Sequence, residues 1–96
     1  MDVNREIRMA VNTGTVDFGI KEAKENVENE ECEILIISSN CPDENLKNSK
    51  EYNGIPIYVY QGNNQQLGSA AGKPFAVSAI SIKDAGNSNI LSLKAE

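Results

Sequence analysis

Phe75 follows Gly72, Lys73 and Pro74, which form a typical turn sequence, and it precedes an apolar segment of strand composition over 76–82. An aromatic ring in a loop can stack on a flat partner such as an unpaired nucleobase, and an adjacent lysine favours a polyanion. The chain has only three tyrosines and two phenylalanines, so the position of each ring is informative. The alternative role for Phe75 is to close a gap over the core.

Two earlier segments carry other groups that suit RNA. Gly19 opens a segment of helical spacing, where free backbone N–H groups and the nearby Lys21 cation favour a phosphate. Asn40 follows a buried apolar segment, and its amide offers both the donor and the acceptor that read a base edge. The alternatives are a sharp turn at Gly19 and an Asx turn at Asn40 ahead of Pro42.

Cys41 is the one candidate nucleophile, because a following helix start could lower its pKa as in cysteine phosphatases. The chain has no histidine for acid–base chemistry, and Lys47 stands six residues beyond Cys41 where a phosphoryl clamp needs arginine. The spacing of Cys32 and Cys41 fits neither a zinc site nor a disulfide framework. We therefore expect two free thiols in a reducing cytosol, with no metal and no cofactor, and a cysteine-dependent phosphoryl-transfer enzyme stays a remote alternative.

Length and charge narrow the class of protein. With 96 residues the chain suits one domain with one core. Its net charge of −5 comes from the first 33 residues, which hold nine acidic and four basic residues, whereas the remainder holds five of each. No apolar run approaches the roughly 18 residues of a membrane span, and we expect neither export nor a membrane partner.

The spacing of apolar residues predicts alternating helices and strands. The predicted helices cover 3–11, 20–27, 42–52 and 64–71, and the predicted strands cover 15–18, 34–37, 55–60, 76–82 and 90–93. The uninterrupted apolar run over 34–37 is typical of a strand buried on both faces. This order favours an α/β fold, a three-layer α-β-α sandwich around a mostly parallel, mixed four-stranded sheet. Loops 14–21, 38–43 and 72–78 are expected at one end of that sheet.

Three segments resemble a known family: GTVDFGIK from Gly14, ILIISSNCP from Ile34 and YQGNNQQLGSAAGKPFAVSAISI from Tyr60. They are similar to the L-thirty-e family of archaeal and eukaryotic large-subunit ribosomal proteins, in the L-seven-Ae superfamily. The resemblance covers nearly the whole chain, and the QGNNQQLG and GKPF segments are its most specific parts. It implies an α-β-α sandwich that binds a kink-turn, a sharply bent RNA element with a bulge beside sheared G·A pairs.

On this resemblance, residues 1–96 are a single RNA-binding domain and a structural constituent of the large ribosomal subunit, not an enzyme. Its partners would be kink-turn RNA, in particular large-subunit rRNA, and neighbouring ribosomal proteins, on ribosomes in the cytoplasm. A kink-turn binder that acts in RNA processing or regulation, outside the ribosome, is the alternative. The implied RNA contacts are Phe18, Gly19 and Lys21 on the bulge side and its phosphates, Asn40 on the guanine edge, Phe75 and Val77 on the splayed base, and Gly72 and Lys73 in support of that last loop.

Two positions depart from the family pattern. Thr15 stands where relatives often carry lysine, and Ala76 stands where a basic residue is common. Because both departures remove positive charge, we expect shape, stacking and base-edge hydrogen bonds to contribute more of the affinity than phosphate contacts.

Overall fold

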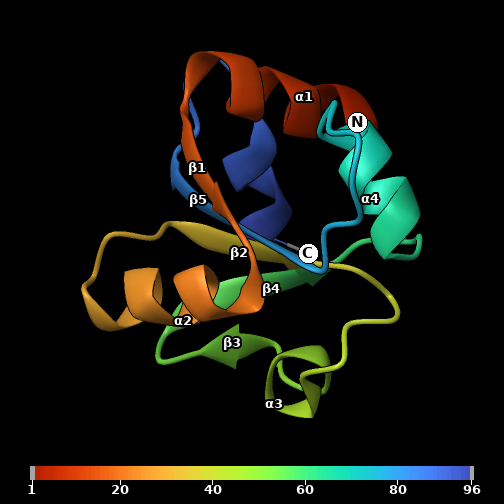
Figure 1. Ribbon diagram of the computed structural model, residues 1–96. Coiled ribbons are helices and arrows are strands. Elements are labelled where there is room, and N and C mark those ends of the chain that lie inside the picture. Colours follow the sequence, from red (N-terminus) through yellow and green to blue (C-terminus); the bar gives the residue numbers. More distant parts are fainter. Residues whose placement is uncertain (1, 96) are drawn as a thin grey trace.

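The computed structural model describes the backbone of residues 2–95 and the side chains of residues 2–93. A sheet lies between two layers of helices, which confirms the expected three-layer α-β-α sandwich (Figure 1). The helices are α1 (Val3–Thr13), α2 (Ile20–Glu28), α3 (Glu44–Lys47), α4 (Asn64–Ala70) and the 3₁₀ helix η1 (Ile90–Ala95). The strands are β1 (Thr15–Phe18), β2 (Ile34–Ile37), β3 (Glu51–Tyr52), β4 (Ile55–Val59) and β5 (Ala79–Asp84).

The sheet is mixed, in the order β1-β5-β2-β4-β3. It differs from the expectation in having five strands rather than four, and β2 with β4 is the single parallel pair within the described residues. The strand that was not expected is β3, at the edge beside β4. The sheet is mostly antiparallel because β5 enters between β1 and β2 from the end where both of them finish. Phe18 therefore pairs with Ile80, and Ile37 pairs with Ala79.

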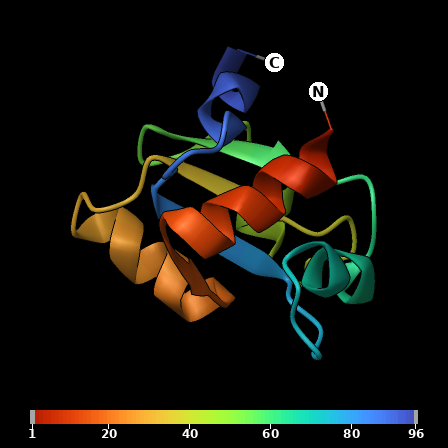
Figure 2. The same ribbon diagram turned by 90° about the horizontal axis from the view of Figure 1, so that it is seen from above.

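The alternation of side chains along β2 divides the interior into two cores. Ile34 and Ile36 face the cluster beneath α1, α4 and η1, whereas Leu35 and Ile37 face the cluster beneath α2 and α3. All four residues are buried, as the uninterrupted apolar run predicts. Seen from above, α1 crosses the sheet with α4 and η1 on its two sides (Figure 2).

The helix predicted over 42–52 is much shorter than expected. The carboxylate of Asp43 accepts hydrogen bonds from the backbone N–H groups of Asn45 and Leu46 and so caps α3, which ends at Lys47. The chain then forms the β3–β4 hairpin, in which Asn53 and Gly54 both have positive φ. Asn-Gly is the favoured pair for such a two-residue turn, so Gly54 joins two strands and does not end a helix.

The last two predicted strands also differ. The strand predicted over 76–82 begins at Ala79, because the N–H of Val77 donates to the carbonyl of Asn64 in α4 and holds this segment off the sheet. The segment predicted as a strand over 90–93 is the helix η1. Ile90 and Leu93, three residues apart, are both buried, which is the spacing of one face of a 3₁₀ helix.

Cys32 and Cys41 are thiols and do not form a disulfide with each other, and both side chains are buried. No helix within the described residues is long and apolar enough to cross a membrane.

Candidate nucleic-acid interface

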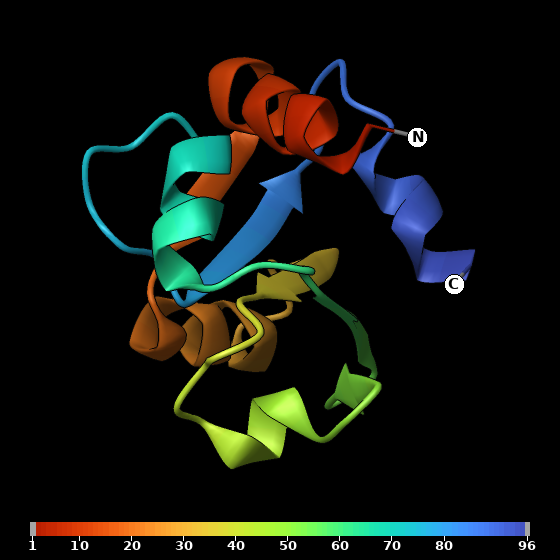
Figure 3. The ribbon, with the colours of Figure 1, turned by 90° about the vertical axis from the view of Figure 1, so that its right-hand side faces the viewer.

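Several loops meet at one end of the sheet. β1, β2 and β4 all finish where β5 begins, because Phe18 pairs with Ile80, and Ile37 pairs with both Ala79 and Val59. Residues 19–21 follow β1, residues 38–43 follow β2, and residues 72–78 lead into β5. We call these three segments together the loop pole. The loop that follows α4 extends outward there, beside the start of α2 (Figure 3).

The two phenylalanines of the chain meet at this pole. The rings of Phe18 and Phe75 lie edge to face, with centroids 6.4 Å apart and planes 89° apart. The ammonium of Lys73 lies 5.1 Å from the centroid of the Phe18 ring, which is a cation–π contact. Phe75 nevertheless remains 54% exposed. The ring therefore does not close the core: it is oriented by its neighbours and presents apolar surface to solvent.

A shallow pocket of about 320 Å³ joins the segments of the pole. Phe18, Gly19 and Ile20 line it from one side, and residues 75–78 line it from the other. Val77 is only 3% exposed and packs in the core beneath α1 and α4, so its side chain forms the floor of this pocket. A flat group could enter between the two walls and rest on this apolar floor.

Gly19 sets the geometry at the start of α2. Its φ of +112° is strained for any residue with a side chain, and its N–H donates to the carbonyl of Ala79 at 2.9 Å. This bond ties the end of β1 to the start of β5. Lys21 is exposed in the first turn of α2, two residues after Gly19. Its cation stands at the end of the helix where backbone N–H groups favour an anion.

Asn40 is connected to the loop of Phe75 through Asn64. The side-chain oxygen of Asn40 accepts the N–H of Asn64 at 2.8 Å, and the carbonyl of Asn64 accepts the N–H of Val77 at 2.9 Å. The amide nitrogen of Asn40 also approaches the side-chain oxygen of Asn64 at 3.4 Å. Asn40 remains exposed, so its amide keeps a hydrogen available for a ligand. The sequence patterns do not predict the link through Asn64, although the polar run over 61–66 is the signal that could have indicated it.

Gly72 and Gly68 allow close approaches that position the Phe75 loop. Gly72 has a φ of +77°, and a Cβ there would lie 3.1 Å from Nε of Arg8. A Cβ on Gly68 would collide with the carbonyl oxygen of Phe75, and the carbonyl of Gly68 accepts the N–H of Lys73 at 2.9 Å. Gly68 and Arg8 are thus further residues of the site. A glycine inside a helix was the available signal for Gly68, and none pointed to Arg8.

Acidic groups gather at the opposite end of α2. The helix has nine residues, so its two ends are roughly 13 Å apart, more than the Debye length of about 8 Å at physiological salt. The acidic run over 28–33 follows its C-terminal end. Lys83 lies 3.0 Å from Glu31 and 3.7 Å from Asp17, and these contacts raise its pKa, mainly through the hydrogen bond to Glu31. The loop pole is therefore separated from this acidic run, although Glu22 lies in the first turn of α2, beside Gly19.

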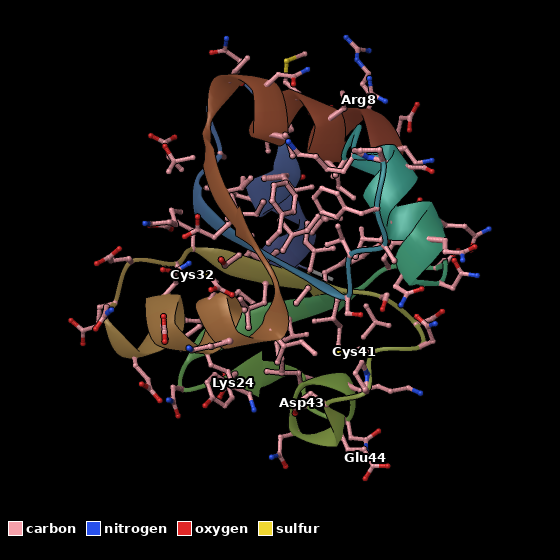
Figure 4. All side chains as sticks on the ribbon, viewed as in Figure 1. Arg8, Lys24, Cys32, Cys41, Asp43 and Glu44 are labelled. Atoms are coloured by element: carbon pink, nitrogen blue, oxygen red, sulfur yellow. The ribbon has the colours of Figure 1, made fainter. Side chains whose placement is uncertain are left out.

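The surroundings of Cys41 do not suit a nucleophile. Its side chain is 3% exposed, and α3 beyond it has only four residues. The carboxylate of Asp43 already accepts the N–H groups of Asn45 and Leu46 at the start of α3. It also forms an ion pair with Lys24 of α2 (Figure 4). A negative carboxylate at this helix start would repel a phosphate.

Comparison with known sequences decides the family. Residues 1–92 match the model of the Ribosomal protein L7Ae/L30e/S12e/Gadd45 family. The chain belongs to this family. Among L7Ae/L30e relatives, it is 40% identical over 93 residues to large ribosomal subunit protein eL30 of Methanospirillum hungatei JF-1, covering 97% of this chain and 98% of the relative. It is also 40% identical over 97 residues to eL30 of Methanothermobacter thermautotrophicus, covering 97% of this chain and 98% of that protein.

A solved structure shares the fold of this chain. A protein with unknown function from Bacillus halodurans C superposes with a TM-score of 0.79 at 27% sequence identity, covering 97% of this chain and 95% of that one. Both eL30 relatives are named as ribosomal proteins, which are structural proteins and not enzymes. These names do not support the alternative of a cysteine-dependent phosphoryl-transfer enzyme.

Proposed function

We propose that residues 1–96 form a single RNA-binding domain, a constituent of the large ribosomal subunit on cytoplasmic ribosomes, that grips kink-turn rRNA at the loop pole. Two relatives with 40% identity carry the name of a large-subunit protein, and each match extends over nearly the full length of both chains. The observation that carries the kink-turn proposal is the ring of Phe75, exposed to 54% yet oriented by Phe18. A surface of this kind suits a base that has left the helical stack.

Each group at the pole takes one part of the RNA in this proposal. The ring of Phe75 stacks on the splayed bulge base, above the floor that Val77 forms in the pocket. Asn40 donates its remaining amide hydrogen to the guanine edge of a sheared pair. The N-terminal turn of α2, with Lys21, and the end of β1 at Phe18 meet the bulge side and its phosphates.

The test is a titration of the protein against a kink-turn and against the same RNA with its sheared G·A pairs replaced by Watson–Crick pairs. We expect tighter binding to the kink-turn and a shallow dependence on salt, because few cations face the pole. Equal affinity for the two RNAs would contradict the proposal.

Substitution at Phe75 tests the stacking contact itself. Phe75→Ala is expected to weaken kink-turn binding by about 1–3 kcal/mol, the usual contribution of a stacked base. Val59→Ala is the matched control, because Val59 is 40% exposed at the end of β4, which lies between β2 and β3, and does not line the pocket. If Phe75→Ala binds as tightly as the control, the ring has no role in recognition.

Co-sedimentation separates a ribosomal role from RNA processing or regulation elsewhere. A ribosomal constituent stays with assembled large subunits through a salt wash, whereas a factor that acts outside the ribosome remains in the supernatant. The neighbouring ribosomal proteins that we also propose as partners would be identified by cross-linking within the same particle.

A further inference from the structure

A second hollow, of about 750 Å³, lies between α1 and α4. Arg5 and Arg8 line it from α1, and Gln65, Gln66 and Ser69 line it from α4. We call these five residues the α1/α4 groove. The two arginines are three positions apart, so they lie on the same side of α1, about one turn from each other. The groove is thus lined by long polar side chains that can donate hydrogen bonds.

The α1/α4 groove is positively charged although the chain as a whole is acidic. Both arginines are exposed, and within the described residues no carboxylate lies within 4.0 Å of either guanidinium. The acidic neighbours on this helix have other partners. Asp2, the one carboxylate in the lining of the same hollow, accepts the N–H of Arg5 at 3.2 Å, and Glu6 accepts the N–H of Asn89 at 2.8 Å. α4 contributes no charged residue.

The α1/α4 groove continues into the loop pole. Gln65 and Ser69 also line a shallow pocket of about 330 Å³ together with Lys73 and Phe75. On the other side, the guanidinium of Arg8 lies against Gly72, the residue before Lys73, since a Cβ on Gly72 would come within 3.1 Å of Nε. The surface therefore passes around α4 from the ring of Phe75 to the two arginines. Figure 4 places Arg8 on α1, on the other side of the sheet from the Lys24–Asp43 pair.

We propose that the α1/α4 groove binds the phosphate backbone of the RNA stem that leaves the kink on the Phe75 side. This inference rests on the proposed function, since the kink must be held at the loop pole for its stem to reach α1. Guanidinium groups match phosphate oxygens with paired donors, and glutamine and serine donors suit phosphate and ribose oxygens. Contacts of this kind carry no base specificity, so the groove adds affinity and direction and leaves the choice of RNA to the pole.

The test compares two RNAs with the full chain. One is a kink-turn whose stems end a few base pairs from the bulge, and the other has its stem extended by about one helical turn. The variant Arg5→Gln with Arg8→Gln is expected to bind the long RNA on the order of 100-fold more weakly, the equivalent of two charge-assisted hydrogen bonds at the lower end of their range. Its slope of log affinity against log salt should fall by roughly two, about 0.9 for each lost phosphate contact. Binding to the short RNA, which does not reach the α1/α4 groove, should fall much less, through the contact of Arg8 with Gly72 alone.

Two further variants are matched to this one. Lys47→Gln with Lys50→Gln removes two exposed cations from the α3–β3 segment, which lies on the opposite side of the sheet from α1. This variant should bind both RNAs with the affinity of wild type. Arg5→Lys with Arg8→Lys keeps the charge and should keep most of the salt slope. Circular dichroism and thermal unfolding will establish that all variants remain folded.

The outcomes separate the two proposals. If the wild type discriminates the short kink-turn from its mutated form, but the glutamine variant binds the long RNA with an unchanged salt slope, the groove proposal is wrong and the kink-turn proposal stands. An equal loss on the short and long RNAs would also overturn the groove proposal, because Arg8 would then act only through the Phe75 loop. If the wild type binds neither RNA, both proposals fail.

Discussion

The carbonyl oxygen of Phe75 lies 2.1 Å from the position that a Cβ on Gly68 would occupy. The loop that presents the Phe75 ring therefore rests on α4 at a place where any side chain would displace it. A second contact fixes the same loop, because the N–H of Lys73 donates to the carbonyl of Gly68. The glycine is unfavourable for the helix and is required by the loop.

Gly68→Ala tests this contact. Alanine favours a helix interior by about 1 kcal/mol over glycine, yet we expect the free energy of unfolding to fall by about 1–3 kcal/mol because the new methyl group must displace the loop backbone. Kink-turn affinity should fall with it. Urea unfolding and the RNA titration measure the two effects, and Asn12→Ala, at an exposed position of α1 that lines neither the groove nor the pole, is the control. A stabilised variant with normal affinity would show that the loop tolerates displacement.

Asn40 has a structural and a proposed recognition role that two substitutions can separate. Asn40→Asp keeps an oxygen to accept the N–H of Asn64 but loses the amide hydrogens and adds a negative charge. Asn40→Ala removes both the accepting oxygen and the amide hydrogens. We expect Asn40→Asp to retain near-normal stability and to lose about 1–3 kcal/mol of kink-turn affinity, the usual contribution of a base-edge contact. Thermal unfolding and RNA titration report the two roles. If Asn40→Asp binds the kink-turn as tightly as wild type, the role of Asn40 is only structural, through its hydrogen bond to Asn64 in α4.

Phe18 supports the Phe75 ring and receives the Lys73 cation. Phe18→Leu keeps most of the apolar volume but removes the edge-to-face pair and the cation–π contact. We expect stability to fall by about 0.5–1.5 kcal/mol, together with weaker kink-turn binding. In NMR spectra the side-chain methylene protons of Lys73 should lose the upfield shift caused by the ring. Unchanged Lys73 shifts would mean that the cation does not occupy this position in solution.

The Lys24–Asp43 pair predicts a dependence of stability on pH. The hydrogen bond from the Lys24 ammonium, followed by those from the N–H groups of Leu46 and Asn45, holds the pKa of Asp43 below its usual value. A lowered carboxyl pKa stabilises the fold above the unfolded pKa of about 3.9, and this contribution disappears as the pH falls through the folded pKa. The substitution Asp43→Asn isolates this effect, because it keeps a side-chain oxygen for the cap of α3 and removes the charge.

We therefore expect wild type to be more stable than Asp43→Asn at pH 7, with the difference vanishing in strong acid. Urea unfolding of both proteins from pH 7 to pH 2 measures it. A difference between the two proteins that is constant across this range would contradict the assignment. Lys24→Met should narrow the same gap, because the main cause of the lowered pKa is then absent.

The layers of the fold and the loops of the pole follow from patterns that are local in the sequence. Apolar residues from Val3 to Val11 recur at helical spacing, and Ile34 to Ile37 form an uninterrupted apolar run of strand length. The ends of β1 and β2 place Gly19 and Asn40 at one end of the sheet. The exposure of Phe75 did not follow, because a ring after Gly-Lys-Pro suits a core contact equally well. Its outward position depends on the contact with Gly68, which joins a helix to a loop.

The errors in the elements arose where tertiary contacts or turn chemistry outweigh apolar spacing. Tyr52 fits the inner side of a longer helix, but the Asn53-Gly54 turn places it in a hairpin. Segment 76–78 has strand composition, but the N–H of Val77 donates to the carbonyl of Asn64 and not to a neighbouring strand. The hydrogen bond between Val77 and Asn64 joins a loop to a helix, so the apolar spacing of neither segment indicates it.

The position of β1 has a consequence for synthesis of the chain. Within the described residues β1 pairs with β5 alone, more than 60 positions later, and the Phe18–Phe75 pair likewise joins segments separated by more than 50 positions. A nascent polypeptide that has emerged only as far as α4 has no partner for β1 and no complete pocket. The pocket of the loop pole can therefore form only after β5 has left the exit tunnel, later than β1, β2 and β4.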